Sequence, residues 1–238
     1  YALANQYSYQ LLKILALAGI DQQNSYLIPI ILENMIFEAQ AIKEARQSLI
    51  PLVEIELLSS LQPGSEFVDS ALPAIIINLA VIYREKNEYL SPAVDLLAGL
   101  GPGVIPVLFA SAAQRTEDPE AARTIQDLTA STALLLMQND QNIIPMLISY
   151  LFYHPGEDGV FGTAASGLDR LVRNGYRNQV AEQAGHPLIY LLFQMEKGEI
   201  PSDELVRKLL NLIFPEKASS TTRSNQYFKS WQSEFGSK

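Results

Sequence analysis

Apolar residues recur at helical spacing along most of the chain, whereas runs that alternate apolar and polar residues are scarce. Residues three and four apart share one face of a helix, so each apolar stripe predicts an amphipathic helix. Three stripes rich in leucine show the pattern: Leu11, Leu12, Leu15 and Ala18; Ile125, Leu128, Leu135 and Leu136; and Leu205, Leu209, Leu212 and Ile213. Glycine and proline interrupt the stripes every 12–20 residues, among them Gly175, Gly185 and Gly198. Such residues end helices, so the pattern predicts twelve or thirteen helices and no sheet.

A proline flanked by aliphatic residues recurs at an interval of roughly 40 residues, the length of a two-helix repeat. The five occurrences are Pro29, Pro73, Pro106, Pro145 and Pro187, separated by 44, 33, 39 and 42 residues. Proline is tolerated in the first turn of a helix, because the N–H that it lacks has no intrahelical partner there. Each proline is therefore predicted to open the first helix of a two-helix unit. On this basis His186 lies in the turn that precedes Pro187.

Residues 100–123 resemble a known repeat family. Leu100–Leu108 combines a Gly-Pro-Gly turn with an aliphatic-proline segment, and Asp118–Arg123 follows after a short spacer. These segments resemble the HEAT repeat, in which an aliphatic-proline helix is followed by a turn with an Asp and a second helix with an Arg. The resemblance implies that Asp118 and Arg123 belong to a ladder between neighbouring repeats. It covers roughly residues 25–214, but Gly162 stands where the next unit would have its Arg.

The resemblance implies an all-α fold, namely a right-handed α-solenoid of about five HEAT-like two-helix repeats in residues 1–217. Residues 218–238 differ in character. Ala218–Thr222 is polar and is expected to form a flexible link. Four aromatic residues then follow at helical spacing: Tyr227, Phe228, Trp231 and Phe235. This C-terminal aromatic helix is expected either to cap the last repeat or to dock on a partner through Trp231.

Composition excludes several classes of protein. With 238 residues, 48% hydrophobic and 18% charged, the chain is typical of a globular protein with a sizeable core. It contains no cysteine, which excludes a disulfide framework and a cysteine metal site. The most apolar runs, residues 71–83 and 130–137, fall short of the roughly 20 residues that span a bilayer. Because the sequence begins with Tyr1 rather than Met, we expect a processed or partial chain, and we favour a cytoplasmic location.

The formal net charge of −9 is unevenly distributed. Residues 1–120 contain 14 acidic and 6 basic residues, whereas residues 121–238 contain 12 and 11. An acidic N-terminal half argues against nucleic acid and favours a basic or mixed-charge peptide as partner. In the other half, Arg170, Arg173 and Arg177 form a basic cluster. It is either an anionic docking patch or a solvated edge paired with Asp169.

Residues suited to catalysis are few. The two histidines, His154 and His186, do not have the spacing of metal ligands, and no Gly-x-Ser-x-Gly motif nominates a nucleophile. The glycine-rich segment Gly99–Gly103 has no preceding strand, and Pro102 removes a backbone donor that a phosphate would need. We therefore read it as a turn, and we predict no catalytic residue, no metal and no cofactor.

Three interpretations of function follow. The favoured one is a non-catalytic scaffold or adaptor that binds a protein or peptide on a solenoid surface, with Arg170, Arg173, Arg177 and Trp231 as candidate contacts. A HEAT-repeat enzyme, similar to bilin lyases or DNA glycosylases, is an alternative. It fits less well, since the chain is acidic and its single Trp lies in the C-terminal segment. The third is a structural segment of a larger solenoid complex.

Overall fold

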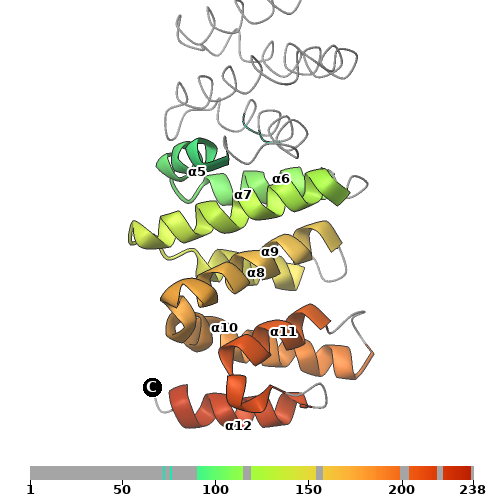
Figure 1. Cartoon of the computed structure of the whole chain (residues 1–238). Helices are drawn as coiled ribbons and strands as arrows, with labels where there is room; N and C mark the ends of the chain where they lie inside the picture. Colours follow the sequence, from blue (N-terminus) through green and yellow to red (C-terminus); the bar gives the residue numbers. More distant parts are fainter. Residues whose placement is uncertain are drawn as a thin grey trace, which may run out of the picture. The chain divides into compact units, whose positions relative to one another are not determined.

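The computed structural model describes residues 90–114, 119–153, 158–198, 204–218 and 222–236, together with Leu72 and Ile76, which are helical and buried (Figure 1). Of this interpretable part, 88% is helical and none is strand, which confirms the predicted all-α class. Its elements are α5 (Leu90–Gly99), α6 (Val104–Gln114), α7 (Pro119–Gln138), α8 (Ile144–Tyr153), α9 (Asp158–Leu171), η3 (Val172–Tyr176), α10 (Arg177–Glu196), α11 (Glu204–Ile213), η4 (Pro215–Lys217) and α12 (Ser224–Phe235).

The chain divides into two compact units, Tyr1–Leu128 and Thr129–Lys238, and the division falls within α7. In the first unit, α5 ends in a turn at Gly101, whose φ of +82° lies in the left-handed region that glycine adopts without strain. The amide of Gly101 donates to the carbonyl of Ala98 at 3.0 Å. The prediction that the glycine-rich segment is a turn is confirmed.

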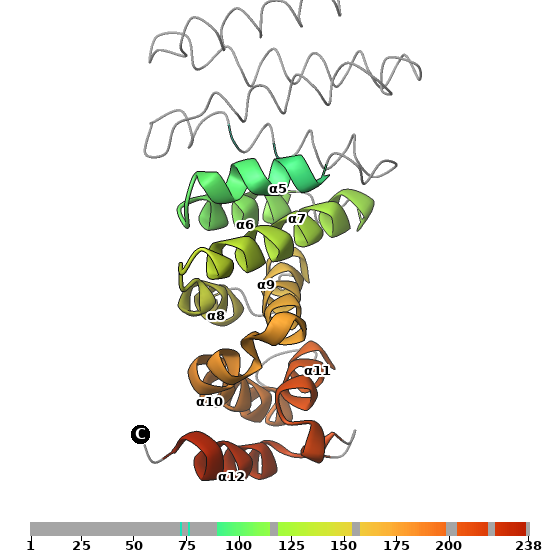
Figure 2. The same cartoon turned by 60° about the vertical axis from the view of Figure 1, so that its left-hand side comes forward.

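In the second unit, α10 is the central element, since it contacts α8, α9, α11 and α12. Nine of its residues are buried, among them Val180, Leu188 and Leu192. Figures 1 and 2 both show α12 lying beside α10. On α9, the predicted apolar stripe of Val160, Ala164, Ala165 and Leu168 is buried.

The repeat prolines lie in two kinds of position. Pro106 is the third residue of α6 and Pro145 the second of α8, as predicted for the first turn of a helix. The prediction for Pro187 is wrong, because Pro187 lies inside the 20-residue helix α10. His186 therefore lies on that helix and not in a turn. Pro29, Pro73 and His154 fall outside the described residues.

The error at Pro187 has a physical origin in Gly185. The sequence pattern predicts that Gly185 ends a helix, but this glycine is buried within α10. A Cβ built at Gly185 would lie 2.7 Å from Cδ1 and 3.2 Å from Nε1 of Trp231. Only glycine leaves room for the Trp231 ring at this position. This requirement comes from the packing of α12 on α10, so the local sequence does not reveal it.

The predicted breaks at Gly175 and Gly198 are confirmed. Gly175 has a φ of +96°, and the non-helical backbone at Asn174 and Gly175 ends the helix that precedes α10. Gly198 has a φ of +77°, and its amide donates to the carbonyl of Met195 at the end of α10. Both glycines occupy the left-handed position that closes a helix.

Helix α11 buries a face shifted from the predicted one. Its buried residues are Val206, Leu209, Leu210 and Ile213, whereas Leu205 is 38% exposed. The stripe correctly predicts a helix here, but of its four residues only Leu209 and Ile213 are buried, since Leu205 is exposed and Leu212 is half-buried. The stripe of Val206, Leu209, Leu210 and Ile213 has the i, i+3, i+4, i+7 spacing of a helix face equally well.

The segment before α12 is tied to the rest of the unit. Thr222 is buried, its hydroxyl donates to the carbonyl of Lys217 at 2.6 Å, and its own carbonyl accepts from Arg207 at 2.6 Å. The expected flexible link therefore ends before Thr222; residues 219–221 fall outside the described part. Beyond it, Tyr227 is fully buried and packs against Phe214, with ring centroids 6.3 Å apart.

We predict that Gly185→Ala destabilises the protein only while Trp231 is present. In a helix interior, Ala is normally more stable than Gly by about 0.5–1 kcal/mol. The Trp231 ring occupies the space of the new methyl group, so the exchange lowers the free energy of unfolding in the wild-type background. In a Trp231→Ala background the same exchange raises it by about 0.5–1 kcal/mol. Urea unfolding followed by circular dichroism measures the four free energies of this cycle.

The matched control is Gly175→Ala, where the strain lies in the backbone and not in contact with Trp231. At a φ of +96°, Ala costs about 1–2 kcal/mol whichever residue stands at 231. An equal effect of Gly185→Ala in both backgrounds would show that the close approach does not govern the packing of α12.

Candidate functional site

A groove of about 390 Å³ lies between α10 and the first turns of α12. Its walls come from one face of α10 and from the N-terminal part of α12. The lining residues are His186, Ile189, Tyr190, Phe193, Glu196, Arg223, Ser224, Asn225 and Phe228. All of them belong to the second unit, so the groove is a feature of one compact body.

The floor of the groove is a face of α10 on which exposed aromatic residues surround the buried Ile189. His186, Ile189, Tyr190 and Phe193 follow the i, i+3, i+4, i+7 spacing and therefore share one side of the helix. Tyr190 is 49% exposed and Phe193 is 41% exposed, which makes them two of the three large hydrophobic residues exposed in the described part. Aromatic side chains of this kind are enriched where proteins bind one another.

The groove aromatics are held in place by their neighbours. Tyr190 stacks on Phe152 of α8, with ring centroids 6.3 Å apart. His186 packs against Phe228 at 5.8 Å and against Trp231 at 5.2 Å between centroids. A side chain that is already ordered loses less conformational entropy when a partner binds.

Two cations lie at the end of the groove where α10 stops and α12 begins. Arg223 is an exposed lining residue. The Lys197 ammonium lies 4.2 Å from the centroid of the Phe193 ring, a cation–π contact. Of the described side chains at this end, the carboxylate of Glu196 is paired with Arg207 and bonded to Ser224, which leaves the positive charges of Arg223 and Lys197.

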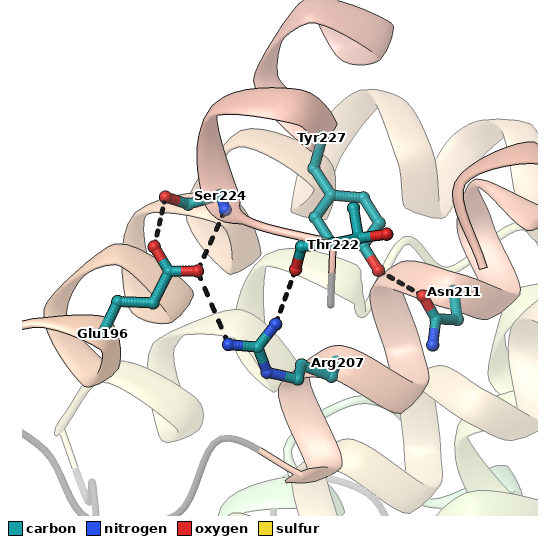
Figure 3. A network of polar contacts seen from close by, with 6 residues as sticks. All are labelled: Glu196, Arg207, Asn211, Thr222, Ser224 and Tyr227. Carbon is teal, nitrogen blue, oxygen red and sulfur yellow. Dashed lines mark hydrogen bonds and ion pairs between the residues drawn. The ribbon is translucent and has the colours of Figure 1, made fainter. Parts of the chain in front are cut away.

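Glu196 is the centre of a polar network that fixes the start of α12 (Figure 3). Its carboxylate accepts from the amide of Ser224 at 3.2 Å and from the Ser224 hydroxyl at 2.8 Å. Arg207 of α11 lies 3.5 Å from the same carboxylate, with side chains 21% and 23% exposed. The first amides of a helix have no intrahelical partner, and Ser224 is the first residue of α12. The carboxylate of Glu196, from α10, therefore caps α12.

A second bond ties α12 to α11. The Tyr227 hydroxyl donates to Oδ1 of Asn211, as Figure 3 shows. Burial raises the pKa of Tyr227 above its ordinary value, and this effect outweighs the opposing influences of Thr222 and Arg207. Tyr227 thus stays neutral and keeps its donor at physiological pH.

The three predicted arginines do not share one set of surroundings. Arg173 forms an ion pair with Asp169 at 2.6 Å, which raises the pKa of the guanidinium, as the solvated-edge interpretation expects. Arg177 lies beyond the break at Gly175, and its Nε donates to the carbonyl of Ile213 at 2.7 Å. Arg177 thereby places a cation at the C-terminal end of α11, where the helix dipole favours it. Arg170 is half-buried.

The other predicted residues lie in different places. Arg123 is exposed on α7, which begins one residue after Asp118. Asp118 falls outside the described residues, so the ladder stays a prediction. Trp231 is half-buried, and its ring packs beneath the groove against His186 and Gly185.

Sequence reasoning missed Tyr190 and Phe193. A signal was present, because residues 188–193 are six consecutive apolar residues, Leu-Ile-Tyr-Leu-Leu-Phe. Such a run makes a helix apolar on all sides, whereas a helix with one side in solvent normally has polar residues on that side. Only the position of α12 shows which of these residues stay exposed.

A smaller hollow of about 280 Å³ in the same unit is rich in side-chain amides. Its lining residues are Met137, Gln138, Asp140, Gln141, Asn142, Tyr176, Gln179 and Gln183. Asn142 is already engaged, since its Oδ1 accepts from the amide of Ile144 at 3.3 Å and its Nδ2 donates to Gln183 at 3.0 Å. These bonds cap α8 and link it to α10, a structural role.

Within the described ranges, no three His, Asp or Glu side chains are grouped so as to hold a metal ion, and no helix is long and apolar enough to cross a membrane. Comparison of the chain with models of protein families, with characterised proteins and with solved structures finds no match. The HEAT resemblance therefore rests on the residues quoted for it.

We predict that Glu196→Ala weakens the attachment of α12. The change removes the acceptor of the Ser224 amide and the carboxylate beside Arg207, which keeps its bond to the Thr222 carbonyl, at a cost of about 1–2 kcal/mol. Glu196→Gln keeps an acceptor oxygen and costs less. In Glu196→Ala, the amides of α12 should exchange faster with solvent than they do in wild type, while those of α8 should be less affected. Urea unfolding measures the change in the total free energy of unfolding. The control is Glu234→Ala on the exposed side of α12, expected to stay within about 0.5 kcal/mol. Equal protection of α12 in all three variants would contradict a capping role for Glu196.

Proposed function

We propose that this protein is a non-catalytic binding scaffold, and that the groove between α10 and α12 is where it holds a protein or peptide partner. The observation that carries the proposal is the pair of exposed aromatic side chains, Tyr190 and Phe193, on the floor of the groove. Each is large and kept in place by a neighbouring group. Exposed aromatic clusters of this kind mark interaction sites.

The wider arrangement proposed for the chain is an α-solenoid of HEAT-like two-helix repeats. Two features support it: Pro106 and Pro145 lie 39 residues apart in the sequence, and each lies in the first turn of a short helix. In such an array a terminal helix covers the end of the last repeat. The packing of α12 on α10 and its capping by Glu196 favour this role for the aromatic helix.

The partner of the groove differs from the one predicted for the N-terminal half. The acidic composition of residues 1–120 favours a basic guest, and that prediction still applies to a surface of that half. The groove has the opposite local charge, because Arg223 and Lys197 lie at its end while Glu196 is bonded to Ser224 and Arg207.

The test is a selection from a random peptide display library on the full chain. We expect the recovered peptides to bind Tyr190→Ala/Phe193→Ala at least about tenfold more weakly than wild type, as for the loss of central aromatic anchors. The control is Leu205→Ala, which changes the third exposed large apolar residue of the described part, on α11 and outside the groove. It should leave binding unchanged.

Two outcomes would overturn the proposal. Peptides that bind the double variant as well as wild type would place the interaction elsewhere. Peptides that instead lose binding to Arg170→Glu/Arg173→Glu would move the partner site to the arginine edge of α9 and η3. Melting curves of each variant ensure that a loss of binding is not a loss of folding.

A further inference from the structure

The structure also carries an inference about the form of the partner, which rests on the proposed function. We infer that the groove receives an amphipathic α-helix with an acidic flank, docked on α10 beside α12. Three features of the groove lead to this: a floor formed by helical backbone that is already hydrogen-bonded, a helical pattern of anchors and the charge at its end.

The first feature concerns the backbone of the guest. The floor of the groove is the second half of α10, where main-chain N–H and C=O groups are bonded within the helix, and the first amide of α12, that of Ser224, is already bonded to Glu196. An extended peptide brings its own N–H and C=O groups, and burying them without partners is costly. A sheet edge would satisfy an extended peptide, but the described part of the chain contains no strand. A helical guest satisfies its own backbone and needs only side-chain contacts.

The second feature is the row of anchors. The exposed residues His186, Tyr190 and Phe193 lie along one stripe of α10, the buried Ile189 lies between them, and Phe228 of α12 borders the stripe. This stripe runs for about 10 Å along the helix axis, given a rise of 1.5 Å per residue. A guest helix that lies along this stripe needs apolar residues at the same i, i+3, i+4, i+7 spacing. To reach from His186 to Lys197 it needs a length of about three turns.

The third feature is the charge. At the end of the groove, Arg223 is exposed and the Lys197 ammonium lies over the Phe193 ring. The carboxylate of Glu196 is bonded to Ser224 and to Arg207. A carboxylate on the flank of the guest complements the two cations, which fixes the register and direction of the guest more than it adds affinity.

The experiment uses the peptides recovered with the full chain from the random display library, made synthetically and titrated by fluorescence anisotropy. In each peptide whose binding depends on Tyr190 and Phe193, a central residue outside the apolar stripe is replaced by Pro or, as a matched control, by Ala. A helical guest should lose about a hundredfold in affinity with Pro and little with Ala. Proline tolerated at that position would overturn the helical form.

The charge is tested on the same peptides with Lys197→Glu/Arg223→Glu. The control is Lys208→Glu/Lys217→Glu, which changes the net charge by the same amount at exposed positions outside the groove lining. We expect the groove variant to weaken binding at least about tenfold and the control to stay within about twofold. Equal effects of the two variants would overturn the acidic flank.

Different results would overturn the helical form of the guest and the use of the groove as a binding site. Groove-dependent peptides that tolerate proline would leave the groove as a binding site and overturn only its helical guest. A selection that yields no groove-dependent peptide would overturn both.

Discussion

The contact between the backbone of α10 at Gly185 and the ring of Trp231 determines where α12 lies, and the groove exists because α12 lies there. With any larger residue at 185 the ring would have to move, since a Cβ would be 2.7 Å from Cδ1. The other end of α12 is held by a different kind of interaction, the carboxylate of Glu196 on Ser224. The helix is thus attached at two points of α10, separated by eleven residues of that helix.

Between these two points α10 keeps an apolar face that α12 only partly covers. Residues 188–193 are apolar throughout; the side that carries Leu188, Leu191 and Leu192 faces the core, and Tyr190 and Phe193 remain exposed. A proline within a helix costs about 3 kcal/mol or more. Burial of several leucines, each contributing about 1.5–3 kcal/mol, offsets that cost at Pro187. Tyr190 and Phe193 contribute less to this balance, because about half of each side chain stays exposed, and that exposed apolar surface is what points to an interaction.

The sequence was sufficient for the class of fold and for the helix ends that glycine closes by its own backbone. Gly175 and Gly198 could be predicted because a left-handed residue after a helix is a local requirement. Gly185 and Pro187 could not, because a glycine and a proline that would favour a turn lie within a helix there, and the close contact of Gly185 is with Trp231, 46 residues further along the chain. The candidate site was harder to predict from the sequence than the helix ends. The groove depends on which aromatics α12 leaves uncovered, and the bond from Arg177 to Ile213 spans 36 residues.

The acidic character of the whole chain and the basic end of the groove are compatible, because they act over different distances. A net charge of −9 sets the long-range field that a partner meets in solution. At physiological ionic strength that field is screened beyond about 8 Å, so inside a docked complex the nearest charges decide the pose. Arg223 and Lys197 are those nearest charges, whereas Glu196 is held by Ser224 and Arg207. The carboxylate that caps α12 is therefore also the reason that we expect an acidic group at the end of the groove, since its own charge is already matched by Arg207 within the fold.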